Sequence, residues 1–345
     1  MDLGVNNQYE TTIMEPTIQS EIGLYREIFQ SIDFDKIIDH PNILIAAHFW
    51  EPERYEAAKA CYKFMRTIDD LIDNFKTEHK TIAPTEKAQL ENNVNSWINT
   101  ILLAAQNNPE QTELIETVTK FSIPSWPLEA FAKSMVYDIH NDGFPTLQDY
   151  LDYAGGASVA PASIFVHLCG LTKENGTYNP PAFDVKQAAT PCAIFSYLVH
   201  IIRDFVKDHT HNLNYFPDDL MKKHGLNRTS LLAMAKGSTI TPGFREMIRE
   251  LVTVADAYRI KTFEVMQKIM PKLEPRSQLS MKIIFDLYLM VFERIDIENG
   301  TFTTEELNPT PEEIKGRVRK VIEEFEEFES LKLYKRSYTL VHEQL

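Results

Sequence analysis

The 345-residue chain is 43% hydrophobic and 11% aromatic, which is enough apolar material for a large core and excludes wholesale disorder. Its formal net charge of −15 disfavours nucleic acid and anionic membrane surfaces as electrostatic partners. Three widely spaced cysteines, Cys61, Cys169 and Cys192, fit neither a disulfide framework nor a zinc site. They indicate buried thiols in a reducing compartment, so we expect a cytoplasmic protein.

The chain reads as a short tail followed by helices. Its first residues carry no basic segment followed by an apolar one, so we expect no signal peptide. Residues 1–20 are polar and aperiodic, which predicts a flexible tail. Over residues 21–345 helical periodicity recurs between short connectors, and no stretch sustains the alternation of a strand. We therefore predict a single all-helical domain.

The segment from Arg54 to Asp73 has the periodicity of an amphipathic helix with acidic residues on its polar side. Asp69 and Asp73 are four residues apart, so their carboxylates lie roughly 6 Å apart along the helix axis. Like charges at this spacing repel each other, and a bound Mg²⁺ ion would turn the repulsion into coordination. The pattern alone is equally typical of a helix with a solvated charged face.

The segment from Tyr153 to Thr172 lacks Asp, Glu, Lys and Arg. Its glycines, together with Pro161 and His167, make it a poor membrane span. We expect a buried core helix that follows a glycine-rich turn at Gly155 and Gly156.

The segment from Ala193 to Asp208 has apolar residues around nearly half of its helical wheel, which predicts a largely buried helix. Asp204 and Asp208 nevertheless lie on it, again four residues apart. A buried carboxylate is costly unless it is paired or bound to a metal, so this pair indicates a functional site. The alternative is that Arg203 or Lys207 captures the carboxylates as ordinary ion pairs.

Two acidic pairs that face each other across a cavity would form a cage for several Mg²⁺ ions, and those ions would hold a diphosphate. Metal ions would also explain how so acidic a protein binds an anionic ligand. The remaining apolar surface of such a cavity would suit a hydrocarbon chain.

At both motifs the sequence resembles the squalene/phytoene synthase family. Tyr62 to Asp73 resembles the first aspartate motif of that family, and Ile202 to Asp208 resembles the second. The similarity extends over roughly residues 38–300. Further matches lie at Asp138, in the tyrosine/glycine segment from Tyr150 to Val159, in Tyr215-Phe216-Pro217 and at Tyr288.

The resemblance implies an all-α, single-domain class I isoprenoid synthase bundle with a central pocket. It also implies that Mg²⁺ draws diphosphate from one prenyl chain and that a second chain attacks the allylic cation. The resulting cyclopropyl diphosphate would rearrange to a head-to-head (1-1') product of the squalene or phytoene type. Farnesyl or geranylgeranyl diphosphate would be the substrate. The sequence contains no glycine-rich dinucleotide fingerprint that would indicate NADPH, and the use of NADPH stays open. Weak association with a membrane for product release stays open as well.

The same resemblance implies which side chains act. The expected metal ligands are Asp69, Asp70, Asp73, Asp204 and Asp208. The side chains expected to contact or shield the substrate are Tyr62, Arg66, Asp138, Tyr150, Tyr197, His200, Arg203 and Tyr288. Among them the arginines would contact diphosphate, and the catalytic tyrosines Tyr62 and Tyr150 would steer cations. The alternative for each tyrosine is a core aromatic residue with a satisfied hydroxyl.

The sequence also departs from the family pattern. Lys207 stands where an acid usually precedes the last aspartate, and His200 and Tyr197 replace an asparagine and a glutamine. His40 and Asn42 stand in place of an early serine pair that contacts phosphate. Two alternative functions therefore remain. One is a class I terpene cyclase that ionises a single prenyl diphosphate, and the other is a non-catalytic helical protein that binds lipid or a partner.

Overall fold

The computed structural model describes residues 15–37, 42–79, 82–103 and 109–342. By its internal contacts the chain divides into two compact units. The larger is Asn42–Pro309, and the smaller combines Met1–Pro41 with Thr310–Leu345. The tail expected over residues 1–20 falls largely outside the described residues, which begin with a helix at Glu15.

The smaller unit pairs a helix from each end of the chain. Its elements are α1 (Glu15–Ser31), the 3-10 turn η1 (Phe34–Ile37) and α16 (Pro311–His342). α1 packs against α16, where the rings of Tyr25 and Phe325 meet edge to face with centroids 6.1 Å apart. Arg26 donates a 2.6 Å hydrogen bond to Glu326 across the same contact.

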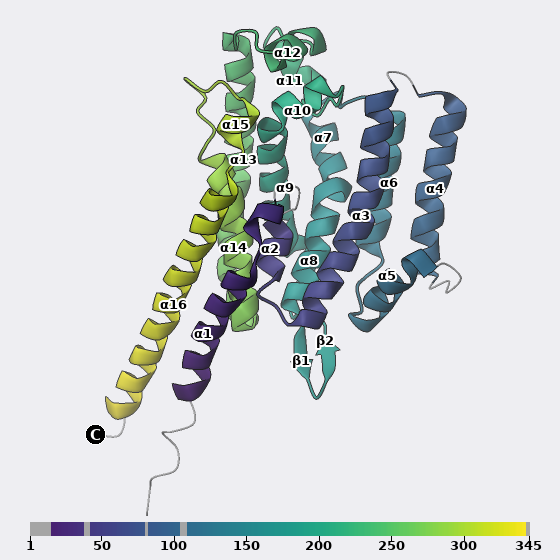
Figure 1. Ribbon diagram of the computed structural model, residues 1–345. Helices are drawn as coiled ribbons and strands as arrows, with labels where there is room; N and C mark the ends of the chain where they lie inside the picture. Colours follow the sequence, from purple (N-terminus) through teal and green to yellow (C-terminus); the bar gives the residue numbers. More distant parts are fainter. Residues whose placement is uncertain (1–14, 38–41, 80–81, 104–108, 343–345) are drawn as a thin grey trace, which may run out of the picture. The chain divides into compact units, whose positions relative to one another are not determined.

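The larger unit is almost entirely helical (Figure 1). Its α-helices are α2 (Asn42–Ala47), α3 (Pro52–Glu78), α4 (Pro84–Leu102), α5 (Pro109–Lys120), α6 (Trp126–His140), α7 (Leu147–Ala154), α8 (Ala160–Gly170), α9 (Val185–Arg203), α10 (Phe205–Thr210), α11 (Asp218–Lys223), α12 (Arg228–Ala235), α13 (Pro242–Ile269), α14 (Pro275–Phe292) and α15 (Thr304–Leu307). A 3-10 turn, η3 (Met270–Lys272), separates α13 from α14. Several helices, among them α3 and α13, begin with proline, whose fixed φ and missing amide hydrogen suit the first helical position.

The core of the larger unit forms around α9. This helix packs most extensively against α13 and α8, and also contacts α14 (Figure 1). α6 packs against α3, α4 and α8. The α9 side chains that are buried include Ala193, Ile194, Phe195, Leu198, Val199, Ile201 and Ile202. The prediction of a largely buried helix leading into the second motif is therefore confirmed.

The sequence predicted one uninterrupted helix from Ala193 to Asp208, and this prediction is wrong. α9 ends at Arg203 and α10 begins at Phe205. Asp204 lies between them with φ −89° and ψ 9°, outside the helical region. Its amide still donates to the His200 carbonyl at 2.8 Å, and its carbonyl accepts from the Asp208 amide at 2.8 Å. The interruption at Asp204 therefore leaves the two aspartates one hydrogen-bonded turn apart.

The prediction of a glycine-rich turn before the core helix is also wrong. Gly155–Val159 forms a π-helical segment, η2, which joins α7 to α8. At Gly156 a Cβ atom would lie 2.1 Å from the Ala130 carbonyl oxygen, so only glycine allows α6 to approach this closely. Within a helical run, π segments of this kind occur frequently at functional sites.

The connector between α8 and α9 contains a β-hairpin, although no strand was predicted from the sequence. β1 (Thr172–Glu174) pairs with β2 (Thr177–Asn179) in antiparallel register. Asn175 and Gly176 have φ values of 50° and 82°, as a two-residue primed turn requires. Among the described residues, no helix is both long enough and apolar enough to cross a membrane.

Candidate active site

α3 presents its acidic residues on a stripe that also carries an arginine. Arg66 donates a 2.8 Å hydrogen bond to Asp69 and forms an ion pair with Asp70. One turn further on, Asp73 accepts a 3.4 Å hydrogen bond from the hydroxyl of Tyr215, which follows α10. A segment adjoining the second motif therefore reaches the first.

The second motif presents its two aspartates differently. Arg203 forms a bidentate pair with Asp204, with Nε–Oδ1 at 2.8 Å and Nη2–Oδ2 at 2.7 Å. Burial opposes ionisation of Asp204, but this guanidinium outweighs it, and the pKa of the carboxyl lies below its usual value. The side chain of Asp208 has no hydrogen bond or ion pair among the described residues. The ion-pair alternative is therefore confirmed for Asp204 through Arg203 and does not extend to Asp208.

The two motifs lie within electrostatic reach of each other. Burial, followed by the charges of Asp204 and Asp73, raises the pKa of Asp208 to about 8. Burial and the neighbouring charges of Asp69 and Asp138 raise the pKa of Asp73 to about 8 as well. The neighbouring carboxylates therefore disfavour ionisation of Asp73 and Asp208, in surroundings where burial already disfavours it. The two acidic pairs predicted from the sequence do converge.

Asp69 and Asp204 are partly shielded from solvent. Asp69 keeps 30% of its side-chain surface accessible to solvent, and Asp204 keeps 25%. Enough protein nevertheless surrounds Asp69 for burial to raise its pKa to about 6, despite the neighbouring Arg66. The solvated charged face that was the alternative for the first motif therefore describes Asp70, whose side chain is 47% exposed, but not Asp69, whose carboxylate burial disfavours.

Asp138 on α6 lies close to the aspartates but already has a partner. Its Oδ1 accepts a 2.6 Å hydrogen bond from Lys76 Nζ, and both side chains are buried. Lys76 also donates to the Asn141 carbonyl at 3.3 Å. The sequence analysis missed Lys76, although it follows Asp73 by three residues on the same helix. That spacing was the one available signal.

Aromatic side chains form a wall beside the carboxylates. The rings of Tyr150 and Tyr197 stack with centroids 5.4 Å apart and planes 7° apart, and Tyr153 lies 6.3 Å from Tyr197. Burial, with a smaller contribution from Asp208, raises the pKa of Tyr150 well above its usual value. The Tyr150 hydroxyl has no hydrogen-bond partner among the described residues. The alternative of a core tyrosine with a satisfied hydroxyl therefore does not hold for Tyr150.

His200 stands between the second motif and α14. Its ring meets Tyr288 edge to face at 5.2 Å. Burial and the charge of Arg203 lower the pKa of His200 to about 3, so its imidazole is neutral at physiological pH. Tyr288 is in turn within electrostatic reach of Tyr62 on α3, which connects α3 to this group of side chains.

Hydrogen bonds, ring contacts and electrostatic interactions therefore connect the side chains predicted for the site, which come from α3, α6, α7, α9, α14 and the segment from Asp204 through α10. Of the departures from the family pattern, His40 lies outside the described residues, and Asn42 begins α2. Within the described ranges, no group of three His, Cys, Asp or Glu side chains gathers closely enough to hold a metal ion unaided.

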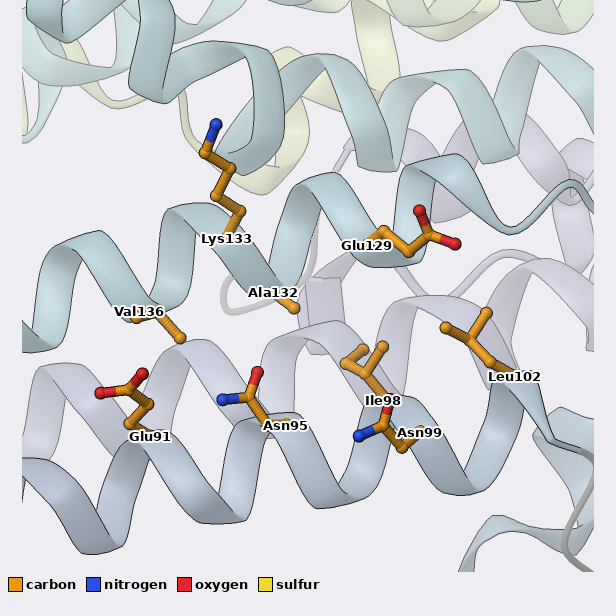
Figure 2. Close-up of a pocket in the computed structure, with 9 residues that line it drawn as sticks. All are labelled: Glu91, Asn95, Ile98, Asn99, Leu102, Glu129, Ala132, Lys133 and Val136. Carbon is orange, nitrogen blue, oxygen red and sulfur yellow. The ribbon is translucent and has the colours of Figure 1, made fainter.

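A surface groove of about 350 Å³ lies apart from these residues, between α4 and α6. Figure 2 shows Asn95 and Asn99 of α4 on one side and Glu129 and Lys133 of α6 on the other. None of the side chains predicted for the site lines this groove.

Comparison with known proteins identifies relatives in one family. Residues 40–313 match the family described as squalene/phytoene synthase. The chain is 22% identical over 247 residues to phytoene synthase 2, chloroplastic, of Solanum lycopersicum, and the aligned region covers 71% of this chain and 74% of that protein. It is 21% identical over 247 residues to the chloroplastic phytoene synthase of Narcissus pseudonarcissus, where the aligned region covers 71% of this chain and 54% of that protein. The chain spans about half the length of the Narcissus protein and of two further chloroplastic phytoene synthases that it matches.

Solved structures resemble the fold. A dehydrosqualene synthase in complex with ligand superposes with a TM-score of 0.60 at 16% identity, covering 91% of this chain and 98% of the other. Squalene synthase HpnC from Alicyclobacillus acidocaldarius gives 0.56 at 14% identity, covering 81% and 95%. These likenesses confirm the predicted all-α isoprenoid synthase fold. Because the family match extends over most of its length, this chain belongs to the squalene/phytoene synthase family.

Proposed function

We propose that this protein catalyses the Mg²⁺-dependent head-to-head condensation of two prenyl diphosphates, farnesyl or geranylgeranyl diphosphate. The observation that carries the proposal is the convergence of Asp73 and Asp208 from separate helices, where each retains a raised pKa of about 8. Burying two such carboxylates is unfavourable in the ligand-free protein, and bound cations would remove the penalty. Membership of the family and the fold likeness support the same reaction class.

The residues suit magnesium. Carboxylate oxygens are its preferred protein ligands, and Mg²⁺ usually completes its shell with water and substrate phosphates. This mode of binding needs few protein ligands for each ion, and within the described ranges no group of three acidic, histidine or cysteine side chains is placed to hold an ion without the substrate. Asp69, Asp73, Asp204 and Asp208 would hold the ions. When bound, Mg²⁺ would neutralise the diphosphate and make it a better leaving group.

The other side chains have distinct tasks in this proposal. Arg66 and Arg203 lie beside the aspartates and would bind diphosphate oxygens through their guanidinium forks. The stacked faces of Tyr150 and Tyr197 would stabilise an allylic cation electrostatically, since aromatic faces attract positive charge. Neutral His200 would add no positive charge next to that cation.

A second candidate is a class I cyclase that ionises one prenyl diphosphate. The stacked Tyr150–Tyr197 pair favours it, because two large rings occupy space next to the second motif and would shield a single folded cation. A family glutamine is the expected occupant of the Tyr197 position, and a smaller polar side chain would leave more room for a second substrate.

Product analysis separates the candidates. The purified protein is incubated with Mg²⁺ and either farnesyl or geranylgeranyl diphosphate, with and without NADPH, and the products are identified by mass spectrometry. The condensation predicts a product with twice the carbon number of the substrate. A cyclised or hydrated product of unchanged carbon number would support the cyclase instead. A non-catalytic protein would release no diphosphate from either substrate, and it would tolerate Asp73→Asn with no loss of ligand binding.

A further inference from the structure

In each aspartate motif, an arginine of the same motif already holds one carboxylate. Arg66 donates to Asp69 at 2.8 Å and pairs with Asp70 on α3. Arg203 grips Asp204 through both of its carboxylate oxygens, at 2.8 Å and 2.7 Å. The Arg203 and Asp204 side chains are only 22% and 25% exposed, so solvent screens this pair weakly.

Among the described residues, no cationic side chain forms an ion pair with the other carboxylate of each motif. Asp73 accepts a long hydrogen bond of 3.4 Å from the neutral Tyr215 hydroxyl. The side chain of Asp208 has neither a hydrogen bond nor an ion pair among the described residues. The two motifs, which come from distant parts of the chain, therefore share one pattern: the arginine takes the first aspartate of the i, i+4 pair and leaves the second.

We propose that Arg66 and Arg203 are internal counter-ions, which occupy Asp69 and Asp204 in the ligand-free protein and transfer to the diphosphate when it binds. The inference rests on the proposed function and adds an order to it. A cation arriving alone must displace a guanidinium from its carboxylate. A diphosphate offers the guanidinium another anionic acceptor, because two of its phosphate oxygens can accept both hydrogen bonds of the fork, so its arrival frees the carboxylates for the metal.

This arrangement couples the two ligands. The factor by which diphosphate tightens metal binding must equal the factor by which metal tightens diphosphate binding. Part of that factor comes from direct contact between the ions, which any diphosphate site would share. The part that belongs to the counter-ions is visible in metal binding without diphosphate, where the arginine acts only as a competitor.

The test measures Mn²⁺ binding, by the electron paramagnetic resonance of the free ion, with and without inorganic pyrophosphate. We expect Arg203→Gln to bind Mn²⁺ alone at least about 5-fold more tightly than the wild type. Pyrophosphate should then increase Mn²⁺ affinity by a smaller factor than in the wild type. Arg203→Lys keeps the charge but loses the bidentate fork, and should also bind Mn²⁺ alone more tightly.

Lys207→Gln is the matched control. It also removes one positive charge, and that charge acts on both Asp69 and Asp208, but Lys207 forms no ion pair among the described residues. We expect it to change Mn²⁺ affinity clearly less than Arg203→Gln does. Equal shifts in the two variants would show a general charge effect and overturn the proposal, and so would an unchanged affinity in Arg203→Gln.

Arg66→Gln keeps the test decisive if the Arg203 variants do not fold, because Arg66 is 44% exposed and less involved in packing. It should shift Mn²⁺ affinity in the same direction. The proposed function and the counter-ion inference fail separately. A wild-type protein that binds no Mn²⁺ even with pyrophosphate contradicts the function, whereas normal wild-type binding with unshifted arginine variants contradicts only the counter-ions.

Discussion

Replacing Asp208 with asparagine should stabilise the metal-free protein at alkaline pH. Burial and the charges of Asp204 and Asp73 raise the pKa of the Asp208 carboxyl to about 8. Asparagine has nearly the same shape and carries no charge. The substitution therefore removes a group whose ionisation the folded protein opposes, at little cost in packing.

The sign of the effect follows from the two states of the carboxyl. In the unfolded chain it ionises near its ordinary pKa of 3.8, whereas in the folded protein it keeps its proton to about pH 8. The wild type therefore loses stability as the pH rises from about 4 to about 8, and the loss then levels off. At about 1.4 kcal/mol per pKa unit the upper limit is about 5–6 kcal/mol. Because Asp208 remains partly accessible to screening by solvent, we expect about 1–2 kcal/mol.

Thermal unfolding measures this difference. An unfolding entropy of about 2.1 cal/mol/K per residue gives about 0.7 kcal/mol/K for the whole chain, so Tm should rise by about 1–3 °C at about pH 8.5. At about pH 3 the Tm difference should almost vanish, because the carboxyl is then largely protonated in both the folded and the unfolded state. Saturating Mg²⁺ and pyrophosphate should reverse the ranking, since the wild type alone then keeps every carboxylate ligand.

Asp204→Asn is the matched comparison, on the same motif and with the same chemical change. It removes the acceptor of the bidentate Arg203 pair and leaves a largely buried guanidinium without its partner. We expect Tm to fall under the conditions in which Asp208→Asn raises it. A lower Tm for Asp208→Asn at alkaline pH without metal would refute the reasoning, because it would show that the fold stabilises that charge.

Three further substitutions test contacts near the candidate site. Lys76→Met leaves the buried Asp138 carboxylate unpaired and should lower the free energy of unfolding by about 3–5 kcal/mol in urea titrations; an unchanged value would mean that the pair is not formed. Gly156→Ala places a Cβ atom 2.1 Å from the Ala130 carbonyl and should lose about 1–3 kcal/mol in the same assay, whereas a neutral result would rule out that close approach. Tyr150→Phe removes a hydroxyl without a partner, so stability should stay within about 0.5 kcal/mol; a larger loss would reveal a hydrogen bond in solution.

The amino-acid sequence alone determined the helical character of the chain and the residues of the candidate site. Helical periodicity and the four-residue spacing of each aspartate pair depend on neighbours in the chain, so they can be read without a structure. The apolar surroundings of Asp204 and Asp208 likewise indicated a buried helix, which the structure confirms as α9. The Asn175–Gly176 turn was also available in the sequence and was overlooked.

Only the tertiary structure decided how these groups share their charges. Lys76 and Asp138 are 62 residues apart, and no local pattern predicts that packing of α3 against α6 joins them. The interruption at Asp204 likewise could not be predicted, because no proline or glycine stands near it in the sequence. Which carboxylate an arginine takes is decided by side-chain positions and by local desolvation. Side-chain positions and desolvation are properties of the folded core. Coulomb energies between buried groups depend on the distances between them, and these distances cannot be obtained from the order of residues along the chain.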